Sequence, residues 1–155
     1  IQVVNTIYTS RTSYTVNQGD TDVPGGSITI TPKLSNSKFL ISVRYFTEVS
    51  GNWDVVYNIL RDGSRINMGG LTGYWSGLTM GRQTYSAATN DSSTPEVVNF
   101  RTLDTTGSTV GVPITFKLVN SAPSRTVWIN RTFGSDGQIS YENSTSEIIV
   151  MEIKG

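Results

Sequence analysis

The last twelve residues of the chain, Ser144 to Gly155, constrain the fold more than any other part of the sequence. In an extended strand their apolar side chains point to both faces, with one parity holding Ile148 and Val150 and the other holding Ile149, Met151 and Ile153. Such a run is typical of a strand that is covered on both sides. We therefore expect a buried final strand whose second face is covered by another sheet or by another copy of the chain. Glu152 interrupts the run, and because a lone buried carboxylate is costly we expect it to be exposed or paired.

The amino-acid composition excludes several kinds of function. The chain contains no cysteine and no histidine, which excludes disulfides, Cys/His zinc sites and the nucleophile pairs that need an imidazole. Its twelve basic and twelve acidic residues cancel, which argues against a nucleic-acid partner. No apolar run is long enough to span a bilayer, so we expect no membrane insertion. We also expect no cofactor.

The length of 155 residues predicts a single domain, residues 1–155, with enough core to fold without covalent staples. The chain begins at Ile1 rather than at a methionine. This start suggests that the domain is the C-terminal head of a longer protein.

Short alternating runs bounded by turn residues predict an all-β fold. The runs that show the alternation are 27–31, 38–49, 53–61, 96–103, 110–119 and 126–132. Two further extended pieces are expected within 1–16, with the core candidates Val3, Ile7, Tyr8, Tyr14 and Val16. No stretch has helical spacing. Together these runs predict a sandwich or jelly roll of about eight to ten antiparallel strands.

Two turns are predicted from their chemistry. Asp62-Gly63, between Arg61 and Arg65, has the residues of a tight hairpin turn. A charged binding tip is the alternative, but we favour a turn flanked by solvated arginines. The second turn is expected at 23–26, where a proline is followed by two glycines.

Aromatic residues in and near a long irregular segment are the candidate binding site. The segment 67–93 loses all periodicity, apart from one short strand expected around 78–85, and long loops of this kind are usually functional. Aromatic faces stack on sugar rings, and short polar side chains bind sugar hydroxyls. The candidate ligand-binding residues are Trp53, Tyr74, Trp75, Tyr85, Asn90 and Asp91, with Asn52, Asp54 and Ser76 as further hydrogen-bonding neighbours. The alternative is that these aromatics only fix the loop to its own domain.

Several acidic residues are candidates for catalytic or metal-binding groups. The pairs Glu48/Asp54 and Asp91/Glu96 are candidates for a glycosidase, which needs two carboxyl groups at a set separation. Because twelve acidic residues supply many accidental pairs, we expect the protein not to be an enzyme. Asn90-Asp91 and Asp136-Gly137 lack the alternating acidic loop of a calcium site, so no metal is expected.

One basic residue, Arg131, has two interpretations. It could bind an anion, or it could pair with Glu152 across neighbouring strands. An ion pair or simple exposure is the interpretation we favour, because weak surface pairs are common.

Several stretches, in this order along the chain, resemble a group of tailed-bacteriophage virion proteins. These stretches are 28–32, 37–41, 59–66 (Ile-Leu-Arg-Asp-Gly-Ser-Arg-Ile), 127–132 (Val-Trp-Ile-Asn-Arg-Thr) and 146–153 (Ser-Glu-Ile-Ile-Val-Met-Glu-Ile). Members of the group look like small all-β heads of fibres and spikes, or decoration proteins. The resemblance implies a homotrimeric jelly roll of the C1q/TNF type, whose first and last strands are neighbours near the three-fold axis. It would place Ile149, Met151 and Ile153 at the trimer interface.

The resemblance also implies a function. It favours a non-enzymatic domain on the virion surface that contacts other virion proteins and binds host-surface glycan through its loops. The alternative is a carbohydrate-binding module of a secreted bacterial protein. Such a module would share the aromatic loop but would not need to trimerise.

Overall fold

The structure is a computed structural model that describes residues 2–50, 55–81, 96–134 and 142–155. Within these ranges it has no helix, and its eleven strands are β1 (Gln2–Tyr8), β2 (Thr12–Val16), β3 (Thr21–Ile30), β4 (Lys38–Val49), β5 (Val55–Arg61), β6 (Ser64–Arg65), β7 (Thr79–Gly81), β8 (Glu96–Asp104), β9 (Ile114–Ser121), β10 (Arg125–Ile129) and β11 (Ser146–Ile153). All pair antiparallel in two sheets. The predicted all-β sandwich is therefore confirmed. The number of strands exceeds the expected eight to ten because the count includes the very short strands β6 and β7. The described part of the chain has no helix able to cross a membrane.

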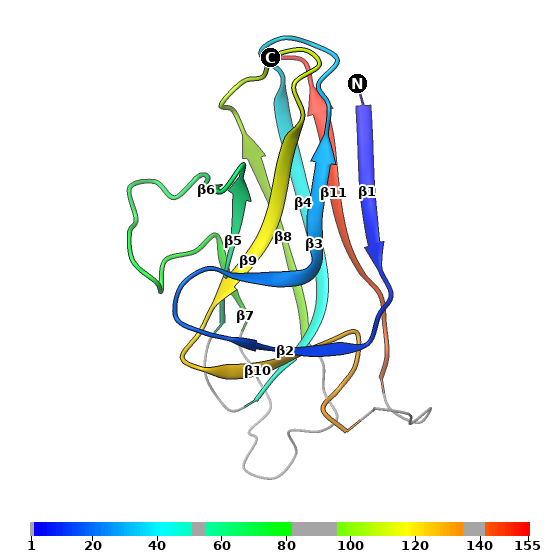
Figure 1. The fold of residues 1–155 in the computed structure, drawn as a ribbon, viewed down its shortest axis with the longest axis vertical. Coiled ribbons are helices and arrows are strands. Elements are labelled where there is room, and N and C mark those ends of the chain that lie inside the picture. The colour runs from blue at the N-terminus through cyan, green and yellow to red at the C-terminus, as the bar shows by residue number, and fades with distance from the viewer. Residues whose placement is uncertain (1, 51–54, 82–95, 135–141) are drawn as a thin grey trace.

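The first sheet is built around β11 and β4. Its order is β1-β11-β4-β10-β2, and β8 pairs with the other side of β4. The first and last strands are therefore neighbours, paired along all of β1 from Gln2↔Glu152 to Tyr8↔Ser146. Figure 1 shows these strands running along the long axis, with both termini at one end and with β2 and β10 crossing at the other end.

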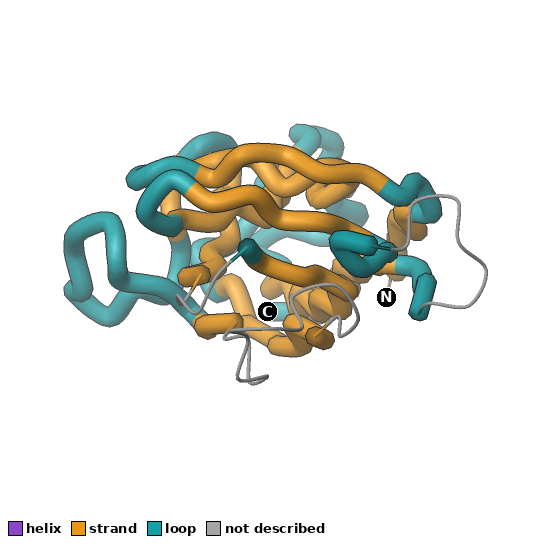
Figure 2. The backbone as a smooth tube through the Cα atoms, turned by 90° about the horizontal axis from the view of Figure 1, so that it is seen from below, coloured by secondary structure: helices purple, strands orange, loops and turns teal. Residues whose placement is uncertain are grey.

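The second sheet has the order β3-β9-β5-β6, and β7 pairs with β5. Figure 2, seen along the long axis, shows the two layers and a loop that projects from one side. The core lies between the layers. The alternation predicted for 38–49 is confirmed in β4, where Phe39, Ile41, Val43 and Tyr45 are all buried. Phe39 meets Phe116 of β9 with ring centroids 5.6 Å apart.

The hairpin at Asp62-Gly63 is confirmed, but its arginines are not solvated. Both turn residues have positive φ, 47° and 87°, as a two-residue hairpin turn of type I′ requires. The Arg61 guanidinium donates to the buried Asp104 carboxylate at 2.5 Å and to the Gly107 carbonyl at 2.6 Å. The Arg65 guanidinium binds both carboxylate oxygens of Asp20. The two arginines therefore tie the hairpin to the rest of the domain.

Two predictions near the N-terminus were wrong. The segment 23–26 is not a separate turn but part of β3, which bends there through an irregular register between Asp22 and Ser27. Val3 and Ile7 were expected in the core, yet 54% and 57% of their surface is exposed. They share the face of β1 that points away from the second sheet, whereas Val4 and Tyr8 pack against the core.

Candidate functional site

The loop that joins β6 to β7, residues 66–78, projects from the side of the sandwich (Figure 1). Each end of this loop is bound to β5: the Ile66 amide donates to the Ile59 carbonyl at 3.1 Å, and the Leu78 amide donates to the Tyr57 carbonyl at 2.9 Å. Ile66 is buried, and Leu78 packs against the core. The loop therefore leaves and re-enters the domain at two fixed points.

The side chain of Arg65 fixes the middle of the loop. Besides binding Asp20, its guanidinium donates to the Gly73 carbonyl at 3.0 Å and to the Ser76 carbonyl at 3.3 Å. The Asn58 amide donates to the same Ser76 carbonyl at 3.0 Å. A planar guanidinium has several donors in a fixed arrangement, so a single arginine can join two loop carbonyls to a carboxylate.

Local turns complete the shape of the loop. The Ser76 hydroxyl donates to the Thr72 carbonyl at 2.7 Å, and Gly73 between them has a φ of 98° that favours glycine. Gly77 lies so close to β5 that an added Cβ would be 2.0 Å from Cγ1 of Val56. The sequence suggested that Ser76 binds sugar hydroxyls, but its hydroxyl proton is used inside the loop.

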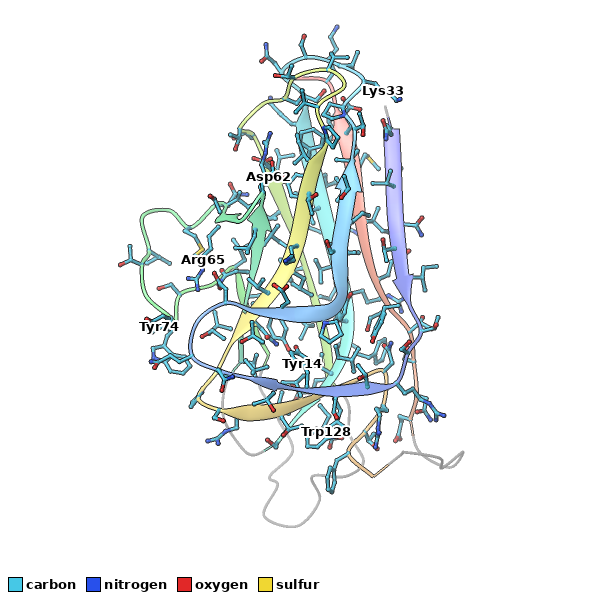
Figure 3. All side chains as sticks on the ribbon, in the orientation of Figure 1. Tyr14, Lys33, Asp62, Arg65, Tyr74 and Trp128 are labelled. Atoms are coloured by element: carbon cyan, nitrogen blue, oxygen red, sulfur yellow. The ribbon has the colours of Figure 1, made fainter. Side chains whose placement is uncertain are left out.

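Tyr74 and Trp75 lie on the arm of this anchored loop that returns to the domain, and 54% and 50% of their surface is exposed. Figure 3 shows Tyr74 at the side of the sandwich, beyond Arg65. One edge of the Tyr74 ring lies against Gly19. Of the six predicted ligand-binding residues, these two sequence neighbours are thus both exposed on the surface. The other four, Trp53, Tyr85, Asn90 and Asp91, lie outside the described residues, as do Asn52 and Asp54.

The three predicted interface residues lie on the outer face of the first sheet, meaning the face directed away from the second sheet. Ile149, Met151 and Ile153 are each partly exposed there, while Ile148 and Val150 are fully buried in the core. Residues opposite each other in register share a face. One apolar row therefore crosses four strands and consists of Val3, Met151, Leu40 and Leu103.

The outer face also has a polar centre. In the next two rows, Ile149 lies between Asn5 and Ser42, and Glu147 lies between Ile7 and Arg44. Glu147 accepts a hydrogen bond from the Asn5 amide at 3.2 Å and lies 3.9 Å from the Arg44 guanidinium. A shallow depression of about 180 Å³ is lined here by Ser42, Val43, Arg44, Asn99, Arg101, Glu147 and Ile149.

Glu152 was expected to be either exposed or paired, and it is paired with hydrogen-bond donors. The carboxylate is buried and accepts hydrogen bonds from the Ser37 hydroxyl at 2.7 Å and from the Lys33 and Leu34 amides at 2.9 and 3.0 Å. Desolvation by itself raises the pKa of Glu152, but these hydrogen bonds to the ionised form outweigh it, so the pKa lies below its ordinary value. The carboxylate thus closes the loop between β3 and β4.

Arg131 does not pair with Glu152. Its side chain is buried, and its guanidinium donates to the carbonyls of Thr132 and Phe133 at 3.1 and 3.0 Å. Glu152 instead closes the loop after β3, near the opposite end of β11 from the bridge between Arg131 and Asn143. Neither simple exposure nor the predicted ion pair describes this arginine.

The acidic residues considered for catalysis are placed only in part. Glu48 is buried and accepts a hydrogen bond from the Phe133 amide, so its carboxyl group does not face solvent. Asp54 and Asp91 lie outside the described residues. Among the residues that are described, no three acidic side chains gather in a way that could hold a metal ion.

Two features of the surface were missed in the sequence. The first is a polar depression of about 340 Å³ near the Asp62-Gly63 hairpin, lined by Asn36, Arg61, Asp62, Thr106, Gly107, Ser108, Thr109, Val112, Pro113 and Ile114. The second is the contact of Trp128 with Phe133, whose ring centroids are 4.9 Å apart. Both features involve residues in irregular segments or in segments distant in the chain. The alternation of apolar and polar residues therefore could not predict them.

Comparison with known proteins gives no assignment: no protein-family model matches the sequence, and no curated protein matches it significantly.

Proposed function

We propose that this domain is a non-enzymatic surface domain of a phage virion, a fibre or spike head or a capsid decoration domain, that binds host-surface glycan through the loop 66–78. The observation that carries the proposal is the exposure of Tyr74 and Trp75 on a loop that Arg65 holds in one shape. Large aromatic side chains left exposed on a surface loop are available for stacking on the apolar face of a sugar ring.

The anchoring of the loop supports binding rather than a purely structural role. Tyr74 touches Gly19 along one ring edge, but more than half of its surface stays exposed. Ile66, Leu78 and the Arg65 hydrogen bonds already fix the loop, so the aromatics are not needed for that. A loop that is ordered before binding loses less conformational entropy when a ligand arrives. The geometry thus favours passive recognition by a rigid scaffold.

The strand order supports a trimeric jelly roll of the C1q/TNF type. The first and last strands are neighbours, and the outer face beside them combines partly exposed Ile149, Met151 and Ile153 with exposed Val3 and Ile7. Contiguous exposed apolar surface of this kind usually marks an interaction site. In the proposed trimer this face surrounds the three-fold axis. A single-copy carbohydrate-binding module, the alternative, gives no reason for an apolar outer face.

The glycan proposal is tested by Trp75→Ala with Leu71→Ala as the matched control. Leu71 lies on the same loop and has 61% of its surface exposed, but it has no aromatic face. Both variants are applied to an array of bacterial surface polysaccharides. We expect Trp75→Ala to lose binding to the glycans that the unmodified protein retains, and Leu71→Ala to keep it. Equal binding by Trp75→Ala, with an unchanged melting temperature, would contradict the proposed site.

A further inference from the structure

A second aromatic surface lies at the end of the sandwich opposite the termini. Trp128 of β10 and Phe133 pack edge to face, with ring centroids 4.9 Å apart and an interplanar angle of 72°. Trp128 is partly buried, whereas 54% of the Phe133 surface is exposed. Figure 3 shows Trp128 at this end, well below Tyr74 in that view.

Buried charged side chains fix the backbone that carries Phe133. Its amide donates to the buried Glu48 carboxylate, and its carbonyl accepts a hydrogen bond from the buried Arg131 guanidinium. The turn before it is also fixed, because the buried Asn130 has a φ of 60° and its amide donates to the Tyr8 carbonyl at 2.8 Å. Burying charged groups is costly, yet the residue that they hold in place directs its own ring outward.

Hydroxyl groups lie beside these rings on the same face of the sheet. Trp128 is opposite Ser13 in register, and Thr126 is opposite Thr15, so all four side chains share one face of the β2–β10 pair. Ser13 and Thr15 are exposed. The surface therefore combines an aromatic pair with short hydroxyls at strand spacing.

We propose that this β2–β10 surface, formed by Trp128, Phe133, Ser13 and Thr15, is a second sugar-binding site. A pyranose ring would stack its apolar face on the exposed Phe133 beside Trp128 while its hydroxyls bond to Ser13 and Thr15. The inference rests on the proposed glycan-binding function and adds to it. Two sugar sites on one chain favour a repeating polysaccharide over a single terminal sugar, because the second contact is made at a high effective concentration.

The experiment follows the indole N–H resonances of the three tryptophans by NMR, assigned with Trp128→Phe and Trp75→Phe. The probes are methyl β-D-glucopyranoside, methyl β-D-galactopyranoside and methyl N-acetyl-β-D-glucosaminide, with glycerol as a polyol that has no ring. We expect the Trp128 resonance to shift saturably with at least one glycoside. Phe133→Ala should weaken that titration roughly three- to tenfold. Val110→Ala, which truncates an equally exposed apolar residue elsewhere, should leave it unchanged.

The same spectra separate this inference from the proposed function. A shift of Trp75 with no shift of Trp128 overturns the second site and leaves the loop site standing. A shift of Trp128 alone supports the second site and contradicts the loop site. The inference is also overturned if glycerol shifts Trp128 equally, if Phe133→Ala titrates like the unmodified protein, or if Phe133→Ala lowers the solution mass, which would make the surface a contact between copies.

Discussion

Glu152 stays ionised although it is buried, because three hydrogen-bond donors of the protein take the place of the water molecules around its carboxylate. The Ser37 hydroxyl and the Lys33 and Leu34 amides all point at its carboxylate. Hydrogen bonds to a charged acceptor are stronger than those between neutral groups. The residue that interrupts the apolar parity of β11 therefore joins this strand to the loop after β3.

The lowered pKa of Glu152 predicts how stability depends on pH. Since the folded-state pKa lies below the ordinary 4.5, the ionised group contributes stability above the unfolded-state pKa, and this contribution is lost as the pH falls through the folded-state pKa. We expect Glu152→Gln to lower the free energy of unfolding by about 2 kcal/mol at neutral pH, and the difference to shrink in acid. Urea unfolding at several pH values measures this.

Glu147→Gln is the control for that prediction. Glu147 lies on the same strand, but its side chain is partly exposed and its distance to Arg44 is 3.9 Å. Such a pair contributes at most about 1 kcal/mol. A Glu152→Gln deficit that stayed constant down to low pH would show that the loss comes from packing rather than from the charge.

Two buried tyrosines, Tyr45 and Tyr57, and the partly buried Tyr14 predict a separate limit at high pH. Burial raises the pKa of Tyr14, Tyr45 and Tyr57 above the ordinary 10. Because the folded-state pKa is raised, their contribution to stability is present below the unfolded-state value of 10 and is lost as the pH rises above it. In an alkaline ultraviolet titration, we expect these phenols to ionise only together with unfolding.

Tyr14→Phe provides the check on the alkaline step. The Tyr14 hydroxyl accepts a hydrogen bond from the buried Asn120 amide at 2.6 Å, so the variant should still fold but lose about a third of the absorbance change that accompanies unfolding. If all the tyrosines titrated smoothly in the folded protein, these phenols would be open to solvent and the prediction would be wrong.

At the scale of single elements, the strands were predictable wherever one face is core and the other is polar. The alternation in β4 and the turn residues at Asp62-Gly63 gave the correct faces and the correct hairpin. Alternation could not decide β1, which has apolar residues on both faces, and Val3 and Ile7 were assigned to the wrong one. The bend in β3 was likewise hidden, since its proline and glycines are equally suited to a turn and to a bulge.

The loop 66–78 depends on one residue that its sequence does not single out. In the sequence, Arg65 is only a charged residue next to a turn. In the folded domain, its guanidinium contacts Asp20, Gly73 and Ser76. These contacts are distant in sequence or made by carbonyls, so no local pattern reports them. The sequence singled out Tyr74 and Trp75, because aromatic residues are conspicuous in an irregular stretch. It did not predict the Arg65 hydrogen bonds that fix the loop around them.

Arg65→Met tests whether this anchor preorganises the loop. The change removes all five donated hydrogen bonds that reach Asp20, Gly73 and Ser76 while keeping a long apolar side chain. We expect the Leu71 and Ser76 amides to exchange with solvent about tenfold faster, with a loss of about 1 kcal/mol in overall stability because the pair is partly exposed. Affinity of the Trp75 site for sugar should fall as well.

Arg11→Met is the matched control, because Arg11 is exposed and donates a long hydrogen bond to Asn143 at 3.4 Å. It should leave amide exchange in the loop unchanged. If Arg65→Met also left both exchange and sugar binding unchanged, the loop would be held by its two ends alone.

At the scale of the whole molecule, the outer face of the C-terminal strand stays partly exposed among the described residues. Ile148 and Val150 are enclosed between the sheets, while the opposite parity remains partly exposed beside Val3 and Ile7. The sequence predicted this two-sided apolar character, but composition and alternation do not determine what covers the second face. The polar centre at Arg44 and Glu147 would help to set register between copies, since opposed charges disfavour misaligned contacts.

The trimer is tested by the solution mass of the domain. Light scattering at several concentrations should give three times the chain mass of 16.9 kDa, and the double variant Ile149→Asp, Met151→Asp should give one chain mass, because buried carboxylates facing one another at the axis would be strongly destabilising. Val110→Asp, Val112→Asp is the matched control: both residues are exposed and apolar but lie outside the outer face. It should remain trimeric.

A monomeric unmodified protein would contradict the trimer and favour the single-copy binding module, with the aromatic surfaces still to be tested. A trimer that survives the Ile149/Met151 change would place the interface elsewhere on the sandwich.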